Sequence, residues 1–273
     1  MAIITISREL AALGDETAQE LAKLLGYRFI DKHTLEERIK SYGVVGRKFE
    51  KYDERKPSFW ASLSQDRDDY LHYLKTAMLI EASEGGCIFI GRGASAVFRN
   101  IPGVLSVFLV APGEIRCERV KSYFHCDEKR ARQIVDQSDR DRMGFYRYFF
   151  DTEWKEPSNY HLTLNTGFLH PVAAAEIIKF HRDQTLTSEM EVQNTERLKE
   201  LILSQQVVHH ILYEKEISIH FLEASAAGKI VTLYGVANSQ SLVEAAINAA
   251  REAVPDGSIR SEIQVVQEYS VMP

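Results

Sequence analysis

Short apolar segments alternate with helical patterns from Ile3 to about His181, and this alternation constrains the fold more than any other feature. Several of the apolar segments lack polar residues at every second position, so both of their faces are expected to be covered. Strand–helix alternation of this kind predicts a parallel α/β sheet with right-handed crossovers. The expected strands are Ile3–Ser7, Tyr27–Ile30, Cys87–Ile90, Leu105–Val110 and Leu162–Asn165.

The helices between these strands are expected from periodicity and from end signals. Ala18, Leu21, Ala22 and Leu25 recur at i, i+3, i+4 and i+7, which places them on one helix face, and Gly26 can end that helix. The pattern thus predicts helices on both faces of the sheet. The further helices are expected over residues 66–83, 114–124, 127–143 and 171–181.

The character of the sequence changes after residue 182. Residues 183–195 are polar and show no sustained periodicity, so they are interpreted as a linker. The chain is therefore expected to hold one domain over residues 1–182 and a second over residues 196–273.

The second domain is expected to have the element order α-β-β-α-β, a small two-layer α+β unit. Two runs with period 2 flank a turn that contains glycine, which is typical of a hairpin. Ile217, Ile219 and Phe221 are expected on one face of the first strand. Val231 and Leu233 are expected on one face of the second.

Composition excludes some classes of partner. The net charge of −6 gives no reason to expect duplex nucleic acid. The longest apolar stretch, residues 104–111, is too short for a transmembrane segment, and no signal peptide is visible. The three cysteines have no C-x-x-C spacing, and the histidines form no metal-binding pattern. Reduced thiols, a cytoplasmic location and no metal site are therefore expected.

The first candidate for chemistry is the turn between Ser7 and Thr17. A helix that follows a strand presents free N–H groups that suit phosphate, and phosphate loops add glycines and a lysine. Here the turn reads LAALGDET, in which Gly14 is the one glycine, while Asp15 and Glu16 bring negative charge to the helix start. Carboxylates there would repel phosphate. Taken alone, the stretch favours an ordinary turn with an acidic cap.

The second candidate is Arg92 in FIGRGAS, which follows the third strand. Ligands of open α/β sheets bind at the carboxyl ends of the strands, and an arginine there can hold a phosphate or carboxylate in a bidentate way. The alternative is a surface arginine whose neighbouring glycines serve only the turn. Sequence alone leaves both open.

The third candidate is the segment 116–147, where nine lysines and arginines face six acidic residues, a local excess of three positive charges. A solvated pair of helices with i, i+4 salt bridges would explain this pattern. A lid that closes over polyphosphate would also carry such a density of arginine.

These motifs together resemble the cytidylate kinase-like family. The similarity covers nearly all of residues 1–180 and implies a P-loop nucleoside monophosphate kinase fold, with a monophosphate-binding insertion and an arginine-rich lid. It is carried by ITISRE, LGYRFIDK, FEKYDERKPSFW, CIFIGRGAS, FLVAPGEIRCERV and, from Trp154 to Thr166, W-x-x-P-S-N-Y-x-L-x-x-N-T.

The resemblance also implies site residues. Arg92 matches the arginine that contacts the monophosphate in cytidylate kinases, and Arg140 and Arg142 fall in the lid. Asp31 matches the acidic residue at the end of the second strand. His161 stands where the family has an aspartate, which is one departure from the pattern.

The phosphate loop is the larger departure. Relatives carry a G-S-G-G-R type loop, whereas this chain has Ala11 to Asp15, so two glycines and the basic residue are missing while Gly14 remains. Arg8 or Arg47 could replace the missing cation from another position. The monophosphate side and the lid therefore resemble the family more closely than the triphosphate side.

The last part of the chain, from about Thr195, resembles a BON domain. The resemblance is carried by GKIVTLYGV, by the helix over residues 242–254 and by PDGSIRSEIQV. It implies a binding module that contacts protein or phospholipid and supplies no chemistry.

Two readings of function remain. We favour a catalytically impaired pseudokinase that binds a nucleotide or another phosphate-bearing small molecule, since phosphoryl transfer needs charge neutralisation that the altered loop lacks. The alternative is an active ATP-dependent nucleoside monophosphate kinase of the CMP type, which would use ATP and Mg²⁺ as cofactors.

Overall fold

The computed structural model describes residues 2–41 and 64–266. It divides into two compact units, Met1–Thr195 and Glu196–Pro273. Arg47 and the segment FEKYDERKPSFW lie outside the described residues. Within the described residues, no helix has the length and apolar character needed to cross a membrane.

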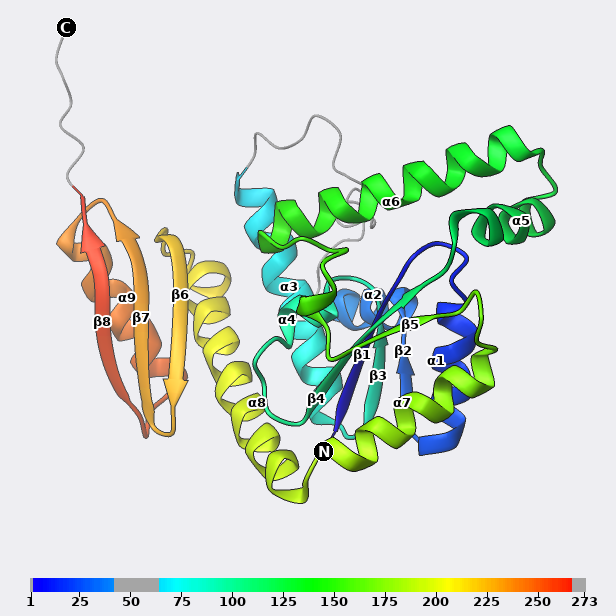
Figure 1. Cartoon of the computed structure of the whole chain (residues 1–273). Coiled ribbons are helices and arrows are strands. Elements are labelled where there is room, and N and C mark those ends of the chain that lie inside the picture. Colours follow the sequence, from blue (N-terminus) through cyan, green and yellow to red (C-terminus); the bar gives the residue numbers. More distant parts are fainter. Residues whose placement is uncertain (1, 42–63, 267–273) are drawn as a thin grey trace, which may run out of the picture. The chain divides into compact units, whose positions relative to one another are not determined.

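The first unit is built on a five-stranded parallel sheet with the order β2-β3-β1-β4-β5 (Figure 1). The parallel sheet predicted from the sequence is confirmed, with each strand within one residue of its expected bounds. Central strand β1 pairs with β3 on one side and β4 on the other. The strands are β1 (Ile3–Arg8), β2 (Arg28–Ile30), β3 (Cys87–Ile90), β4 (Val104–Val110) and β5 (Leu162–Asn165).

Helices cover both faces of this sheet, as the unbroken apolar strands predicted. Figure 1 shows α1 and α7 on one side of the sheet and α3 and α4 on the other. Ile4 and Ile6 of β1 pack with Leu21 of α1 and Ile178 of α7 in one core cluster. The helices are α1 (Gly14–Leu25), α2 (Lys32–Ser41), α3 (Ser64–Ser83), α4 (Ala94–Val97), α5 (Gly113–Phe124), α6 (Glu128–Phe150) and α7 (Pro171–Thr185).

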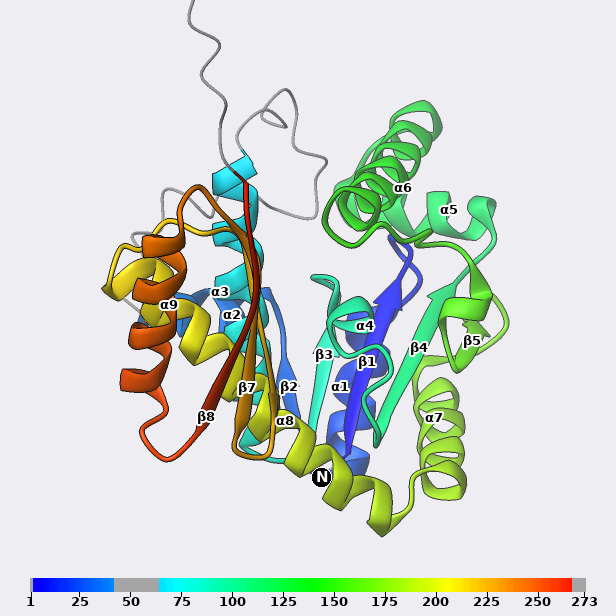
Figure 2. The ribbon, with the colours of Figure 1, turned by 90° about the vertical axis from the view of Figure 1, so that its left-hand side faces the viewer.

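Helix α6 runs seven residues beyond Met143, where the sequence pattern placed its end. The added turns bury Phe145, Tyr146 and Phe149. Because these aromatic side chains remove a large apolar area from water, they stabilise the helix past the polar segment that precedes them. In both views α5 and α6 lie beyond the carboxyl ends of the strands (Figures 1 and 2).

The segment expected as a linker, residues 183–195, is instead mostly helical. Helix α7 continues to Thr185, and α8 (Ser188–His209) begins three residues later. Arg182 joins the two through an ion pair with Glu191 at 2.6 Å. The fully buried Asn194 donates its side-chain N–H to Pro102 O at 2.6 Å. Polar residues that look like a linker in sequence thus serve as anchors for α8.

The second unit has the element order that the sequence predicted. After the end of α8 and a short π-helix (His210–Glu214) come β6 (His220–Ala227), β7 (Ile230–Ala237), α9 (Gln240–Ala253) and β8 (Ser258–Val265). Strand β7 is central, antiparallel to β6 and parallel to β8. Val231 and Leu233 are buried in its core, as expected.

The expected face of Phe221 is wrong. Its side chain is 76% exposed, whereas Ile219 and Leu222 are buried. The register between β6 and β7 shifts between His220 and Glu223, and Phe221 itself has a φ of 53°. A bulge adds one residue to a strand and reverses the faces of the residues beyond it, so the period-2 pattern fails at this point.

Candidate functional site

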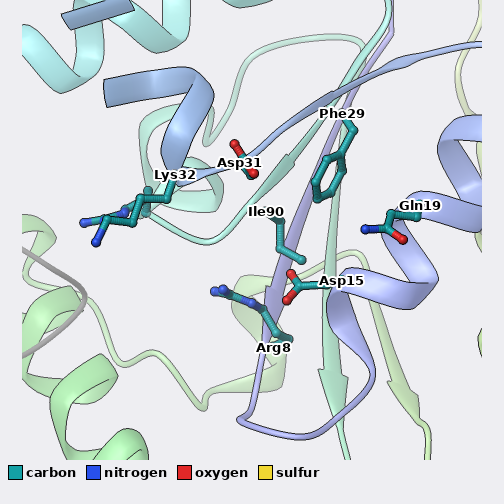
Figure 3. A pocket seen from close by; sticks show the side chains of 8 residues that line it. Arg8, Asp15, Gln19, Phe29, Asp31, Lys32 and Ile90 are labelled. Carbon is teal, nitrogen blue, oxygen red and sulfur yellow. The ribbon is translucent and has the colours of Figure 1, made fainter. Parts of the chain in front are cut away.

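A pocket of about 360 Å³ lies beyond the carboxyl ends of β1, β2 and β3 (Figure 3). This is the edge of an open parallel sheet at which ligands bind, because helix N-termini and strand-end loops converge there. Each of these three strands and the first turns of α1 contribute to its wall. The lining residues are Arg8, Asp15, Gln19, Phe29, Asp31, Lys32, Ile90 and Arg92.

The pocket wall carries three cations and two carboxylates. Asp15, an exposed residue in the first turn of α1, lies beside the side chain of Arg8 (Figure 3). Asp31 caps α2, because one of its carboxylate oxygens accepts from the backbone N–H of Thr34 at 2.9 Å and from its hydroxyl at 3.0 Å. The cations come from β1, the start of α2 and the turn after β3, so they approach the space from three directions.

Arg92 holds its place through an unusual turn. Gly91, Arg92 and Gly93 have φ values of 70°, 56° and 77°, so an arginine occupies a left-handed conformation that costs about 1–2 kcal/mol without glycine. A Cβ at Gly93 would lie 2.2 Å from the ring of Phe150. The Arg92 side chain is 6% exposed and lies 3.5 Å from Glu36. Such strain persists where the surroundings fix a residue for a function.

Gly14 contributes to the site by leaving room for Arg8. A Cβ at Gly14 would lie 2.5 Å from Cγ and 2.9 Å from Cβ of Arg8. The stem of Arg8 therefore crosses the first turn of α1, and any larger residue at position 14 would displace it. Gly14 itself is not among the residues that line the pocket.

The turn between β1 and α1 holds two residues in the left-handed conformation. Ala11 has a φ of 59° and Leu13, the residue before α1, a φ of 54°. Only glycine adopts this region without a steric penalty, so each residue costs the fold about 1 kcal/mol. The turn thus adopts two left-handed conformations without glycine at either position.

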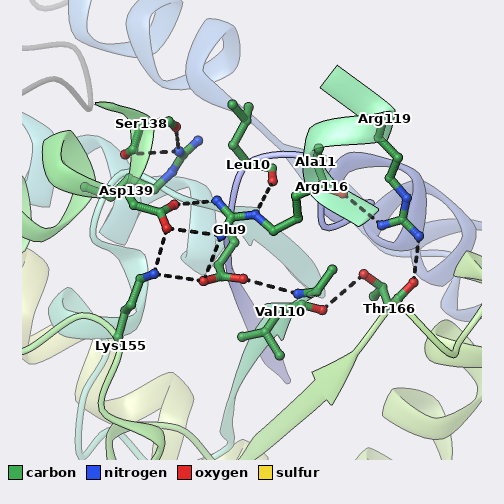
Figure 4. Close-up of polar contacts among 12 residues, drawn as sticks. Glu9, Leu10, Ala11, Val110, Arg116, Arg119, Ser138, Asp139, Lys155 and Thr166 are labelled. Carbon is green, nitrogen blue, oxygen red and sulfur yellow. Dashed lines mark hydrogen bonds and ion pairs between the residues drawn. The ribbon is translucent and has the colours of Figure 1, made fainter. Parts of the chain in front are cut away.

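The carbonyl oxygens of this turn are bound by side chains from distant elements (Figure 4). Arg116 of α5 donates Nε–H to Leu10 O at 2.9 Å, and Arg119, one turn further, donates to Ala11 O at 2.9 Å. The hydroxyl of Thr166 donates to the next carbonyl, Ala12 O, at 2.9 Å. Two arginines of the basic segment 116–147 therefore bind the turn itself.

Four charged residues form a network beside the same turn, in which Glu9, Arg116 and Asp139 are buried and Lys155 is exposed (Figure 4). Arg116 makes two hydrogen bonds to Asp139 at 2.6 and 3.1 Å and lies 3.1 Å from Glu9. Lys155 lies 2.7 Å from Asp139 and 3.0 Å from Glu9. Burial alone would raise the pKa of Asp139, but hydrogen bonds from Arg116 and Lys155 hold that pKa below its ordinary value. Two cations and two carboxylates compensate one another.

Apolar contacts reinforce this attachment. Cys117 and Val120 of α5 pack with Ala131 and Val135 of α6 in a small core of their own. Leu10 and Ala11 of the turn pack against that core. The turn is therefore held to α5 and α6 both by its side chains and by its carbonyl oxygens. We call residues 9–13 the docking turn below.

The lid arginines chosen from the sequence lie outside the pocket. Arg140 is exposed and donates to Gln137 at 2.9 Å. Arg142 bonds Ser138, and its guanidinium lies 6.0 Å from the centre of the Trp154 ring. The structure thus brings Arg8, Asp31 and Arg92 together and leaves Arg140 and Arg142 on α6.

Sequence reasoning missed several residues. Lys32 directly follows Asp31, so the argument from strand ends could have included it. Arg116 was part of the basic segment but carried no separate signal. Glu9 and Lys155 carried no signal in the sequence. They are 146 residues apart, and nothing in their local patterns shows that their side chains are in contact. Among the described residues, no group of three or more His, Cys, Asp or Glu side chains could hold a metal ion.

His161 bonds the neighbouring strand β4. Its Nδ1 accepts the backbone N–H of Ser106 at 2.9 Å, and the Ser106 hydroxyl lies at the same distance. Burial and then the charge of His181 lower the pKa of His161. The folded chain therefore favours the neutral ring, which can accept these bonds.

We expect a pH-dependent stability from His161. Below the unfolded pKa of about 6.5, the unfolded chain binds a proton that the folded chain resists. The free energy of unfolding therefore decreases as the pH is lowered from about 6.5 to the lowered pKa of the folded chain. Because the side chain is largely exposed, we expect a loss below about 1 kcal/mol. Urea unfolding of the wild type and of His161→Asn, whose amide oxygen accepts without titrating, should differ in slope between these pH values. Equal slopes for the wild type and His161→Asn would contradict the assignment.

Comparisons with known proteins agree with this architecture. The family model described as the cytidylate kinase-like family matches residues 3–167, more than half of the chain. An uncharacterized protein from Eubacterium ventriosum ATCC 27560 is 18% identical, with a TM-score of 0.54 over 67% of this chain and 99% of that one, which supports the fold alone.

Two further structures are more distant. Shikimate kinase from Acinetobacter baumannii in complex with shikimate is 18% identical, with a TM-score of 0.40 over 68% of this chain and 96% of that one. Shikimate kinase from Bacteroides thetaiotaomicron is 17% identical, with a TM-score of 0.40 over 67% and 97%. A search of curated proteins gives no match.

Proposed function

Because the chain belongs to the cytidylate kinase-like family, we propose that its pocket binds the phosphate of a nucleotide and that it transfers no phosphoryl group at an appreciable rate. The observation that carries this proposal is the division of the strand-end edge into two halves. One half is an open pocket with three cations. The other half, where a phosphate loop would hold a triphosphate, is bound by side chains of α5 and α6.

The pocket has the chemistry of a monophosphate site. Arg8 and Arg92 offer planar guanidinium groups suited to bidentate phosphate contacts, and Lys32 adds a point charge. Phe29 and Ile90 supply apolar wall against which a base can pack. The volume of about 360 Å³ falls in the range of small-molecule pockets. We therefore propose a nucleoside monophosphate as the ligand class.

The docking turn does not fit a magnesium-bound triphosphate. A phosphate loop offers backbone N–H groups, a lysine for the β- and γ-phosphates and a hydroxyl for Mg²⁺. This chain has two exposed acidic residues, Asp15 and Glu16, directly after Gly14 in the first turn of α1. Arg119 is committed to Ala11 O and Thr166 O, at 2.9 and 2.8 Å. ATP and Mg²⁺ therefore enter the proposal only as ligands expected not to bind well.

The second unit is proposed to act as a binding module. Its α-β-β-α-β order is that of the BON domain which its sequence resembles, and a BON module would contact protein or phospholipid. The proposal assigns recognition of the nucleotide to the first unit and a second contact to this one.

Binding measurements test the monophosphate site. Titration calorimetry with a panel of nucleoside mono- and triphosphates should show binding of at least one monophosphate and much weaker binding of ATP. Arg92→Gln should weaken monophosphate binding about 10- to 100-fold, the value of one or two charge-assisted hydrogen bonds. Glutamine carries a Cβ as arginine does, so the backbone cost of position 92 stays similar.

Arg140→Gln is the matched control. It removes the same charge from an exposed position outside the pocket, and its affinity should stay within about twofold of the wild type. Equal losses in both variants would point to a general electrostatic effect instead of a site. Tight ATP binding that Arg92→Gln leaves unchanged would refute the assignment of the pocket.

A further inference from the structure

We propose that the outer edge of β8 pairs with β8 of a second copy of this chain, so that two second units share one six-stranded sheet. In the described part of the chain, β6 and β8 are the two edge strands of this sheet. An edge strand presents unpaired backbone N–H and C=O groups that template pairing with another chain. The two edges differ in how well they could do so.

Strand β6 is a poor template. Its register shifts between His220 and Glu223, and Phe221 has a left-handed φ of 53°. Such a bulge interrupts the row of backbone groups and is a common way to protect an edge. Strand β8, in contrast, pairs with β7 in unbroken register from Ser258 to Val265.

The direction of the free backbone groups follows from the ladder. Ser258 donates to Lys229 O at 2.8 Å, and Val266 donates to Ala237 O at 3.0 Å, so the even-numbered N–H groups face β7. The odd-numbered residues therefore direct theirs to the outer edge. Of these, Ile263 donates within the chain to the Ser261 hydroxyl, at a long 3.3 Å that a carbonyl from a second strand could replace.

Charge then selects one register. A two-fold axis through Ser261 places this residue opposite Ser261 of the other copy in a hydrogen-bonded pair. In this register nearly the whole of β8 is paired. Arg260 then faces Glu262 of the other copy, twice, in pairs without backbone bonds, where side chains are closest. Both are exposed and, in the described part of the chain, have no ion-pair partner. Moving the axis to residue 262 would instead oppose two glutamates.

The opposite face of β8 supports the same register. Ile259 and Ile263 point toward the helix side of the sheet, yet both are only partly buried, so α9 leaves the margin of β8 uncovered. With the axis at Ser261, Ile259 lies opposite Ile263 of the other copy. Pairing would therefore bury apolar surface on one face while it matches charges on the other.

Sedimentation equilibrium of the full chain tests this pairing. We expect a monomer–dimer equilibrium with a dissociation constant below about 100 µM. Arg260→Glu and Glu262→Arg should each weaken it at least about tenfold, since each places like charges opposite one another twice. The double variant restores both pairs and should return to within about threefold of the wild type.

Two further variants complete the test. Glu223→Arg makes the same charge change on β6, on the open face of the same sheet, and should leave the dimer unchanged. Ser261→Pro removes one outward N–H without removing a bond to β7, so it should abolish dimerisation and leave the fold intact. A wild type that stays monomeric, a dimer that survives Arg260→Glu or Ser261→Pro, or a double variant that fails to recover would each overturn the proposal.

Discussion

Wild-type protein supplied with ATP, Mg²⁺ and each common nucleoside monophosphate is expected to turn over below about 10⁻² per second, whereas kinases typically reach about 1–100 per second. Phosphoryl transfer relies almost entirely on positioning and on neutralising the charge of the β- and γ-phosphates. Absence of one main electrostatic stabiliser costs about 10²–10³ in rate, and the turn between Ser7 and Thr17 contains no lysine and one glycine.

The contacts of the docking turn add to this loss. Arg116 and Arg119, which belong to the basic segment expected to close over polyphosphate, donate to Leu10 O and Ala11 O instead. Carboxylates of Asp15 and Glu16 near a shielded phosphate would each add about 1 kcal/mol or more of repulsion. The expected rate therefore combines missing attraction with added repulsion.

A coupled assay decides the matter, with the active CMP-type kinase as the competing outcome. Turnover near one per second with any common monophosphate, lost in Arg92→Gln, would refute the pseudokinase. An Asp15→Ser, Glu16→Ser double variant separates the two causes. If repulsion dominates, this variant should gain ATP affinity; if Arg116 and Arg119 hold the turn, its ATP affinity should stay weak. Neither outcome affects the monophosphate binding expected at Arg92.

The sheet could be predicted because its signal is local and repeated. Ile3, Ile4 and Ile6 of the central strand are buried on both faces of the sheet. An unbroken apolar run therefore indicates both the strand and the helices that cover its two faces. Helix α6 was underestimated, because its end depends on Phe145 and Phe149 packing against other elements. Such tertiary burial overrides a polar local pattern.

The strand-end argument was made for Arg92 alone, because parallel strands bring their carboxyl ends to one edge. Asp31 was assigned through the family resemblance, and Arg8 as a possible replacement for the missing cation. Arg140, which the family resemblance assigned to the lid, follows the buried Asp139 on α6, and successive helical residues turn by about 100°, which directs Arg140 outward. The docking turn itself could not be foreseen, since its partners lie about 100 or more residues away.

Removal of the Asp139 carboxylate should have the largest effect on stability. The free energy of unfolding of Asp139→Ala is expected to fall by about 3–5 kcal/mol, the usual cost of leaving a buried partner charge uncompensated. Arg116 is 4% exposed and would lose both of its bonds to Asp139, while Lys155 would lose one of its two acidic partners. Asp136→Ala, an exposed change three residues earlier on α6, should cost at most about 0.5 kcal/mol.

Denaturant unfolding, combined with hydrogen exchange of α5, tests whether the charged network holds α5 to the docking turn or only adds to the overall stability. In Asp139→Ala, amides of α5 should exchange faster than those of β1, because the network joins α5 to the docking turn. The double variant Arg116→Met, Asp139→Leu should lose less stability than Asp139→Ala, since it leaves Glu9 and Lys155 paired at 3.0 Å with no lone charge. If Asp139→Ala and Asp136→Ala prove equally stable, the four charges do not hold α5 and α6 to the turn, and the phosphate loop has to be regarded as open to ligand.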